Sequence, residues 1–472
     1  MVARMRAASY LQKSMASFPQ SLLQELETLS FFDKAAFLDA HQNPAPTSVR
    51  IHPVKGPALF ADERSVPWCE TGRYLEQRPV FTLDPLFHAG AYYVQEASSM
   101  FLDQLWRSLF EAQKNMRVLD LCGAPGGKST LLASILDKDS LLISNDVIRS
   151  RASILEENAV RWGYTNHWVA SNDPRDFGRS LTGYFDAMLV DAPCSGSGLF
   201  RKDANALEEW SEGNVALCNA RQQRILADAW PALKEDGVLI YATCSYSIAE
   251  DEEILDWLGD TYDLSSVEVP VAAGWGIVPV RSPKHQLYGY RFFPDKVEGE
   301  GFFIAAVRKA EPAESFFYPR VRSLHHKKLE EAAGYLLRPG SFTFLENDRR
   351  ETIAFNAQHT PDYALLSDCL YLRKAGVTLG SAGQKEWIPA HEAALSLDRS
   401  NALPMADLTR QEALQFLKKE DVALPADMRG WVLAAYEGRA LGWMKVLSNR
   451  SNNYLPKSWR IRMSIDTEDS AR

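Results

Sequence analysis

Two cysteines occupy matching positions, each directly behind an apolar run that has the composition of a buried strand. Cys194 stands in Asp-Ala-Pro-Cys-Ser-Gly behind the run 185–190, and Cys244 stands in Ala-Thr-Cys-Ser-Tyr-Ser behind the run 238–241. Open α/β sheets bind their ligands at the carboxyl ends of the strands. The two thiols are therefore predicted to face one cleft.

Cysteine usage favours free thiols over metal ligands. The chain has six cysteines in 472 residues, and the closest pair, Cys194 and Cys218, is 24 positions apart, so the C-x-x-C spacing of a zinc site is missing. A zinc deaminase would need P-C-x-x-C, but Pro193-Cys194 is followed by Ser-Gly-Ser. We expect no metal. The thiols of Cys122 and Cys218 fit small buried side chains better than reactive ones.

A turn rich in glycine lies between the apolar run 117–121 and a helical pattern over 129–136. Its residues are Cys122, Gly123, Ala124, Pro125, Gly126, Gly127 and Lys128. Such a turn lets backbone N–H groups approach a ligand closely. A phosphate-binding P-loop needs glycine at the place of Cys122, and the dinucleotide fingerprint G-x-G-x-x-G is absent. Lys128 followed by Ser129 leaves an ATPase open as an alternative.

Three aspartates end successive predicted strands and suggest which ligand the turn binds. Asp146 follows the turn by about 20 residues, where doubly wound folds place a carboxylate on ribose hydroxyls. Asp173 and Asp191 end the next two strands. Asp146 or Asp173 alone is more often a helix cap or a turn residue. Together with the turn they suit a nucleoside cofactor without a phosphate chain, and S-adenosylmethionine is the prediction.

Strand and helix patterns alternate over residues 91–310, which predicts an α/β domain with a mostly parallel sheet. We expect strands at 117–121, 141–145, 167–170, 185–190, 238–241 and 301–307, and helices at 129–136, 150–162 and 215–233. A small α+β domain is expected over 1–90. An intermediate α+β segment over 311–406, with a basic linker at 320–328, and a C-terminal domain over 407–472 are expected after the core.

Composition limits the partners. The net charge of −9 means that a nucleic acid must meet a local basic face. No apolar stretch reaches the roughly 18 residues that span a bilayer, and no secretory leader is visible. Together with the sparse cysteines, these features predict a soluble, cytoplasmic protein with no membrane partner. A monomer is the expected oligomeric state.

A basic and aromatic segment over 438–463 is the candidate RNA surface. It carries no acidic residue, and its basic and aromatic members are Arg439, Trp443, Lys445, Arg450, Tyr454, Lys457, Trp459, Arg460 and Arg462. Such a mixture suits phosphate contact with base stacking. Scattered charge on a small β-rich domain is an equal alternative.

Three motifs together resemble the RNA cytosine carbon-5 methyltransferases of the Nop/Sun family: the run 122–130, the run 191–198 and Thr243-Cys244-Ser245. The segment 92–100 resembles the stretch that leads into the family's catalytic domain. The tail 452–460 resembles that of the bacterial small-subunit ribosomal RNA branch. The resemblance is strong over about 90 to 309. It implies a Rossmann-like core that depends on S-adenosylmethionine, a PUA-like C-terminal RNA-binding domain and ribosomal RNA as the partner.

The resemblance also assigns roles. Carbon 5 of cytosine is too weak a nucleophile to take a methyl group from a sulfonium until a thiolate adds at carbon 6. Cys244 is implied as that nucleophile, and Cys194 as the residue that releases product. Asp191 is implied to hydrogen-bond the base near the cofactor. Lys128 is expected to favour a thiolate or to contact the cofactor. The target base must be flipped out or unpaired.

Three other functions remain open at this stage. Transfer RNA is the alternative substrate within the same class. A non-catalytic RNA-binding assembly factor could keep the fold, although the intact Cys194 and Cys244 speak against it. An NTPase would show ATP hydrolysis that depends on Lys128.

Overall fold

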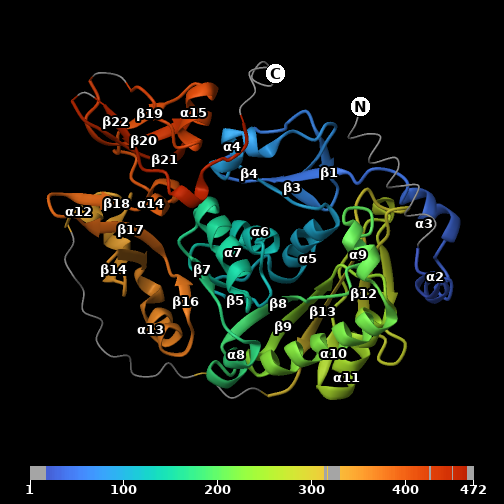
Figure 1. Ribbon diagram of the computed structural model, residues 1–472. Coiled ribbons are helices and arrows are strands. Elements are labelled where there is room, and N and C mark those ends of the chain that lie inside the picture. Colours follow the sequence, from blue (N-terminus) through green and yellow to red (C-terminus); the bar gives the residue numbers. More distant parts are fainter. Residues whose placement is uncertain (1–17, 313–315, 317–329, 425–426, 449, 465–472) are drawn as a thin grey trace.

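The computed structural model describes residues 18–312, 316, 330–424, 427–448 and 450–464. Within them the strands form one ten-stranded sheet and three four-stranded sheets (Figure 1). The large sheet lies at the centre, and the smaller sheets lie around it. The basic run 320–328, expected as a linker, falls outside the described residues.

The central sheet has the order β11-β12-β13-β9-β8-β5-β6-β7-β16, with β10 paired to β13. Strands β7, β6, β5, β8 and β9 are parallel, and β13 runs antiparallel to β9. The bounds are β5 Arg117–Asp120, β6 Leu141–Asn145, β7 His167–Ala170, β8 Phe185–Asp191, β9 Leu233–Thr243, β10 Leu264–Ser266, β11 Val278–Arg281, β12 Tyr288–Phe292, β13 Phe302–Lys309 and β16 Leu372–Lys374. The predicted α/β class with a Rossmann-like core is confirmed.

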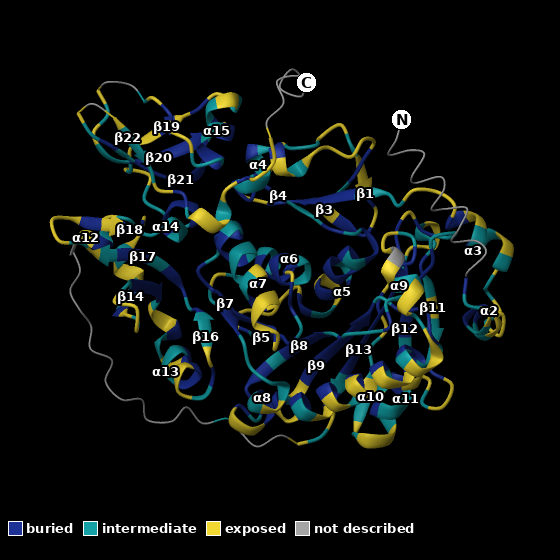
Figure 2. Ribbon diagram, viewed as in Figure 1, coloured by how far each residue is buried: buried dark blue, intermediate teal, exposed yellow. Residues whose placement is uncertain are grey.

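The central residues of the parallel strands are buried and mostly apolar because both faces of the sheet are covered by helices (Figure 2). Val118 and Leu142 face α5 (Phe101–Phe110) and α6 (Gly127–Ile135). Leu119 and Ile143, one residue further along each strand, pack in a second core cluster. That cluster contains α8 (Pro174–Ser180), α10 (Glu212–Ala229) and α11 (Glu252–Thr261). This alternation follows from the two-residue period of a strand.

The largest differences from the expected boundaries lie between α10 and β9. Helix α10 ends at Ala229 rather than 233, and β9 begins at Leu233 rather than 238. Pro231 lies between them, in a short 3₁₀ turn. Proline has no N–H to donate within a helix, so the helix stops before it and the chain enters the strand early.

The N-terminal sheet has the order β2-β3-β1-β4 and stands over the helices of one face. Its strands are β1 Thr47–Ile51, β2 Arg64–Val66, β3 Cys69–Leu75 and β4 Tyr92–Val94, with helices α2 Gln20–Leu26, α3 Lys34–Ala40 and α4 Pro85–His88. Arg50 of β1 is buried, and its guanidinium donates to Thr130 Oγ1 of α6 at 2.6 Å. This contact ties the sheet to the helix that follows the glycine turn.

Two small sheets follow the core. The first comprises β14 Phe342–Glu346, β15 Thr352–Asn356, β17 Val377–Ala382 and β18 Trp387–Pro389, with α12 Glu330–Ala333, α13 Thr360–Cys369 and α14 His391–Leu395. The second comprises β19 Met405–Asp407, β20 Gly430–Tyr436, β21 Arg439–Val446 and β22 Ser451–Asn453, with α15 Arg410–Leu417. Strand β16 leaves the first of these regions to pair with β7, so the segment 311–406 also builds the central sheet.

Across the described ranges, no helix combines the length and the apolar character needed to cross a bilayer.

Candidate active site

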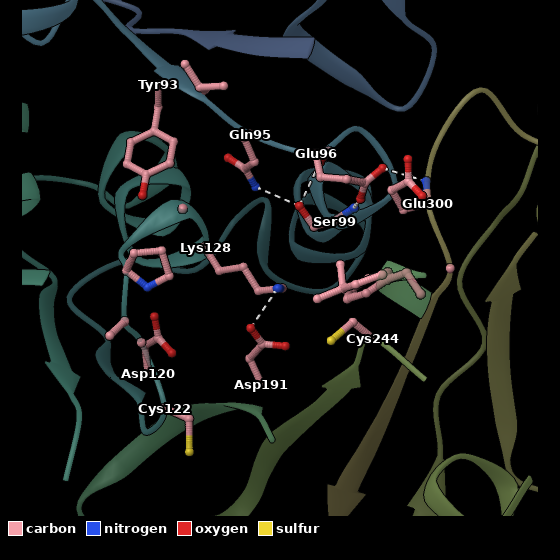
Figure 3. Close-up of a pocket in the computed structure, with 18 residues that line it drawn as sticks. Tyr93, Gln95, Glu96, Ser99, Asp120, Cys122, Lys128, Asp191, Cys244 and Glu300 are labelled. Atoms are coloured by element: carbon pink, nitrogen blue, oxygen red, sulfur yellow. Dashed lines mark hydrogen bonds and ion pairs between the residues drawn. The ribbon is translucent and has the colours of Figure 1, made fainter. Parts of the chain in front are cut away.

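The carboxyl ends of β5, β8 and β9 meet at one edge of the central sheet. The register pairs Asp120 with Leu189 and Asp191 with Ala242, two residues before Cys244. A cavity of about 360 Å³ opens there, and we call it the sheet-edge cavity (Figure 3). It is lined by Tyr93, Val94, Gln95, Glu96, Ser99, Asp120, Cys122, Gly123, Ala124, Pro125, Gly127, Lys128, Asp191, Leu199, Cys244, Glu300, Gly301 and Phe302.

The glycine turn closes one side of this cavity. Gly126 has φ +117° directly before α6. Residues other than glycine rarely adopt this backbone conformation. A Cβ atom on Gly123 would lie 2.8 Å from Ser129 Oγ. The Gly123 N–H donates to Asn145 O at 2.7 Å, which fixes the turn against the end of β6. The turn therefore needs glycine for its shape, and its residues lie where a ligand can reach their backbone.

Asp120 is a site residue that our sequence reasoning missed, although it stands directly before the turn. Ser129 Oγ donates to Asp120 Oδ2 at 2.5 Å. Asp120 Oδ1 is buried and has no hydrogen-bond partner among the described residues. Burial raises the pKa of Asp120 to about 7. An acceptor of this kind fits a positively charged ammonium group of a bound ligand.

Lys128 and Asp191 form an ion pair inside the sheet-edge cavity (Figure 3). Lys128 Nζ lies 2.8 Å from Asp191 Oδ2 and 5.0 Å from the centre of the Phe302 ring. Burial opposes the charge on Lys128, but the Asp191 carboxylate outweighs it and raises the pKa of Lys128. Both residues were predicted for this site, and each orients the other.

The two thiols, predicted to face one cleft, are neighbours, but only one of them lines the sheet-edge cavity. Cys194 Sγ lies 3.1 Å from Cys244 Sγ, and neither is in a disulfide. Cys244 lines the sheet-edge cavity, whereas Cys194 is not among the lining residues. The hydrogen bond between the thiols lowers the pKa of Cys194, and it raises the pKa of Cys244. The pair therefore holds one proton more firmly than the other.

A buried carboxylate, Glu250, joins the two cysteine loops, and sequence reasoning did not identify it. Its oxygens accept from Ser195 N at 2.8 Å, Ser195 Oγ at 2.5 Å and Ser245 Oγ at 2.6 Å. Gln222 Nε2 of α10 donates to it at 3.2 Å. Ser195 and Ser245 each follow one of the cysteines, so Glu250 helps to fix the separation of the two sulfur atoms.

The predicted carboxylates Asp146 and Asp173 lie outside the lining of the sheet-edge cavity. Asp146 follows β6, accepts from Ile148 N at 2.9 Å and lies 3.4 Å from Arg151 Nε. Asp173 caps α8, where its side chain accepts from Arg175 N at 3.2 Å. Asp173 is therefore a helix cap, the alternative that the sequence left open. Contact of Asp146 or Asp173 with a cofactor stays a prediction.

Two further segments line the sheet-edge cavity, and the sequence did not identify either as part of the site. Tyr93, Gln95, Glu96 and Ser99 come from β4 and the residues after it. The resemblance had included the segment 92–100 without assigning these side chains. Glu300 and Gly301 precede β13 and Phe302 begins it, and the sequence predicted this strand without a chemical role. Buried Glu300 pairs with Arg201 at 2.9 Å, a long-range contact that no local pattern signals.

The candidate RNA segment divides into structural and exposed parts. Trp443 is buried and donates to Ala390 O at 2.8 Å, so the expectation that it stacks on a base is wrong. Lys445 pairs with Glu386. The exposed basic residues of the segment are Arg450, Lys457, Arg460 and Arg462.

Three features define the class of the protein: a parallel sheet with an antiparallel strand beside β9, a glycine turn after β5, and the Asp120 carboxylate, one oxygen of which has no partner among the described residues. The protein is a Rossmann-like, S-adenosylmethionine-dependent methyltransferase. The orphaned Asp120 oxygen and the glycine backbone fit the amino acid part of this cofactor.

Comparison with known proteins gives the family. The family described as "16S rRNA methyltransferase RsmB/F" matches residues 107–308. The "N-terminal domain of 16S rRNA methyltransferase RsmF" matches 18–97, and the "Methyltransferase RsmF PUA domain" matches 405–461. The ribosomal RNA small subunit methyltransferase F of Shewanella loihica is 31% identical over 83% of this chain and 82% of its own length. That of Vibrio campbellii is 28% identical over 93% and 97%.

A solved structure, a methyltransferase homologue from Pyrococcus horikoshii, covers 64% of this chain and 99% of its own, with a TM-score of 0.53 and 25% identity. The chain belongs to the 16S rRNA methyltransferase RsmB/F family, and it is an RNA methyltransferase with a PUA domain at its C-terminus. The resemblance and the cofactor expected from the sequence are confirmed.

Proposed function

We propose that the protein methylates carbon 5 of a cytosine in small-subunit ribosomal RNA through a covalent adduct with Cys244. One observation carries this proposal. The Cys244 thiol lines the same cavity as the glycine turn, with a second thiol 3.1 Å behind it. Relatives named ribosomal RNA small subunit methyltransferase F support the choice of RNA.

The Cys244 thiolate adds to carbon 6 of the cytosine, and the electron pair of the 5,6 double bond moves towards carbon 5. S-adenosylmethionine, when bound, supplies an electrophilic methyl group to that carbon. After transfer, a base removes the proton on carbon 5. The electron pair restores the double bond, the bond between carbon 6 and sulfur breaks, and Cys244 is again a thiolate.

Cys194 is the proposed base for release, because its sulfur is within hydrogen-bond distance of Cys244 and its pKa is lowered by that contact. Asp191 is proposed to hydrogen-bond the ring nitrogen or the amine of the base. Lys128 holds the Asp191 carboxylate in place at 2.8 Å, so its role is one of positioning.

The cofactor is proposed to bind along residues 120–128. Asp120 would accept from its ammonium group, and Asp146 would contact the ribose. Asp173 is proposed to contact the base of the cofactor, although its carboxylate also caps α8. Since asparagine is an equally good cap, Asp173→Asn separates the two roles. An increased KM for the cofactor at an unchanged unfolding temperature would identify the contact.

Two alanine variants test the proposal with RNA and cofactor present. Cys244→Ala is expected to lose methylation and to form no protein–RNA adduct. Cys194→Ala is expected to accumulate an adduct that survives denaturing gels. Bisulfite sequencing of the small-subunit RNA identifies the modified base, with transfer RNA as the comparison substrate. Turnover by Cys244→Ala, or methylation of transfer RNA alone, would overturn the proposal.

A further inference from the structure

A second cavity lies where four separate parts of the chain meet, and we call it the junction cavity. It encloses about 390 Å³ between the loop after β1, the end of α4, the segment after α14 and the turn between β20 and β21. Helix α14 contacts both α7 (Arg149–Trp162) and β21, and α4 contacts β21 (Figure 1). Its charged lining residues are Lys55, Arg399, Arg439 and Glu437.

The junction cavity carries an excess of positive charge. Lys55, Arg399 and Arg439 line it, against one carboxylate, Glu437. The Glu437 side chain is 52% exposed and pairs with Arg439 at 3.6 Å, so the uncompensated charges are those of Lys55 and Arg399. Neither Lys55 nor Arg399 has an ion-pair partner within 4.0 Å among the residues that the structure describes. Both residues are partly buried, and positive charges withdrawn from water without counter-charges are unfavourable unless an anion joins them.

The hydrogen bonds of these residues leave donors unused. Lys55 Nζ donates to the carbonyls of Arg161 at 2.7 Å and Ala89 at 3.2 Å. These two hydrogen bonds use two of the three protons of its ammonium group. Arg399 donates through Nη1 to Ala394 O at 2.7 Å, but its buried Nε has no acceptor in the described part of the chain. Burial and the charges of Arg399 and Arg161 lower the pKa of Lys55 to about 7.

Arg161, at the end of α7, adds a further positive charge next to Lys55, although it does not line the junction cavity. Its buried Nε also has no acceptor among the described residues, and its guanidinium lies over the rings of Phe87 and Trp459 at 5.3 and 5.0 Å. Trp459 belongs to the C-terminal segment that presents Lys457 and Arg460 to solvent. These partly buried cations are thus continuous with an exposed basic segment.

We propose that the junction cavity binds a phosphate group, with the RNA backbone as its source. Arginine offers a planar set of donors and lysine a point charge, and both suit the oxygens of a phosphate. The choice of RNA rests on the proposed function. One bound phosphate would contact the N-terminal domain through Lys55, the segment after α14 through Arg399 and the PUA domain through Arg439.

The test measures how RNA binding depends on salt, in the full-length protein without cofactor. A labelled fragment of small-subunit RNA is titrated by fluorescence anisotropy over a series of KCl concentrations. Arg399→Gln is expected to weaken binding about tenfold and to reduce the slope of log K against log salt by about 1, the value for one lost phosphate contact. Arg399→Lys keeps the charge and is expected to keep the slope.

Lys114→Gln removes an exposed charge outside the junction cavity and serves as the control. An unchanged slope in Arg399→Gln, or an equal loss in Lys114→Gln, would overturn the proposal. Because Arg399 also donates to Ala394, the unfolding temperature of each variant is measured. Arg439→Gln replaces Arg399→Gln if the latter is unfolded.

Inorganic phosphate distinguishes the two sources of the ligand. If phosphate stabilises the wild type but not Arg399→Gln, while both bind RNA with the same slope, the site takes a free anion and the RNA source is wrong. Bisulfite sequencing of the wild-type product is scored separately. A protein that loses the slope in Arg399→Gln but forms no 5-methylcytosine would keep the phosphate site and refute the proposed chemistry.

Discussion

Cys194 and Cys244 are separated by 50 positions in the chain, yet their sulfur atoms lie 3.1 Å apart. Adjacent parallel strands, β8 and β9, bring them together at one sheet edge. Two thiolates at this distance would repel each other, so the pair shares its protons unequally. The reactivity of either thiol therefore depends on the other.

Loss of Cys194 is expected to make Cys244 more reactive towards alkylation. The hydrogen bond to Cys194 is the largest cause that raises the pKa of Cys244, so Cys194→Ala lowers that pKa. The thiolate fraction below the pKa rises roughly tenfold for each unit by which the pKa falls. Mass spectrometry of the Cys244 peptide after iodoacetamide treatment measures the rate. Cys369→Ala is the control, and an unchanged rate in Cys194→Ala would contradict the expectation.

Replacement of Glu250 by glutamine is expected to reduce methylation while cofactor affinity is kept. Glutamine cannot accept from Ser195 N, Ser195 Oγ and Ser245 Oγ together, so the sulfur atoms lose their fixed separation. A misplacement of about 1 Å costs on the order of 100-fold in rate. Single-turnover kinetics and cofactor titration check both parts. The exposed neighbour Glu253→Gln should behave as the wild type, and equal losses in both variants would count against a positioning role.

Cofactor binding is expected to weaken as the pH falls through the pKa of Asp120, which burial raises to about 7. Below that pH the carboxyl is protonated and no longer attracts an ammonium group, so affinity decreases by up to about tenfold per pH unit. Calorimetric titrations with the cofactor between about pH 6 and pH 8 measure this dependence. Asp120→Asn should bind more weakly than the wild type above about pH 7, approach it below that pH, and lose the dependence on pH. A dependence that persists in this variant would assign it to another group.

Asp362 is expected to stabilise the contact between α13 and the core in a pH-dependent manner. Burial alone would raise the pKa of Asp362, but hydrogen bonds from His359 and Arg117 lower it below its usual value. Its contribution is therefore present above about pH 4, the pKa in the unfolded chain, and is lost as the pH falls towards the folded value. Asp362→Asn leaves Arg117 largely buried without its carboxylate, at a cost of about 3 kcal/mol.

Urea unfolding near neutral pH and at about pH 2 tests this expectation, because the difference between wild type and Asp362→Asn should shrink only below the pKa of about 4 in the unfolded chain. Asp368→Asn, exposed on the same helix, is the control. A constant difference across the pH range would show that the carboxylate charge is not responsible.

The strands of the core and the two cysteine loops could be predicted from the sequence. Parallel strands are short apolar runs, and polar, glycine or proline residues mark where each run ends. The glycine turn was also predictable, since its backbone excludes other residues. Glu250 and Glu300 could not be predicted. Each is one acidic residue among many, and its importance comes from partners 55 and 99 positions away. The N-terminal contribution to the cavity was missed for the same reason, because β4 reaches it only after the domains pack.

The pairing of β16 with β7 has a consequence for the integrity of the protein. All four residues of β7, His167–Ala170, are buried, and β16 covers their outer hydrogen-bonding edge. A chain shortened after β13 would expose an apolar edge strand, which is a template for association with other chains. The C-terminal part thus covers an edge of the catalytic domain, and we expect a minimal catalytic fragment to need residues 372–374 to stay unaggregated.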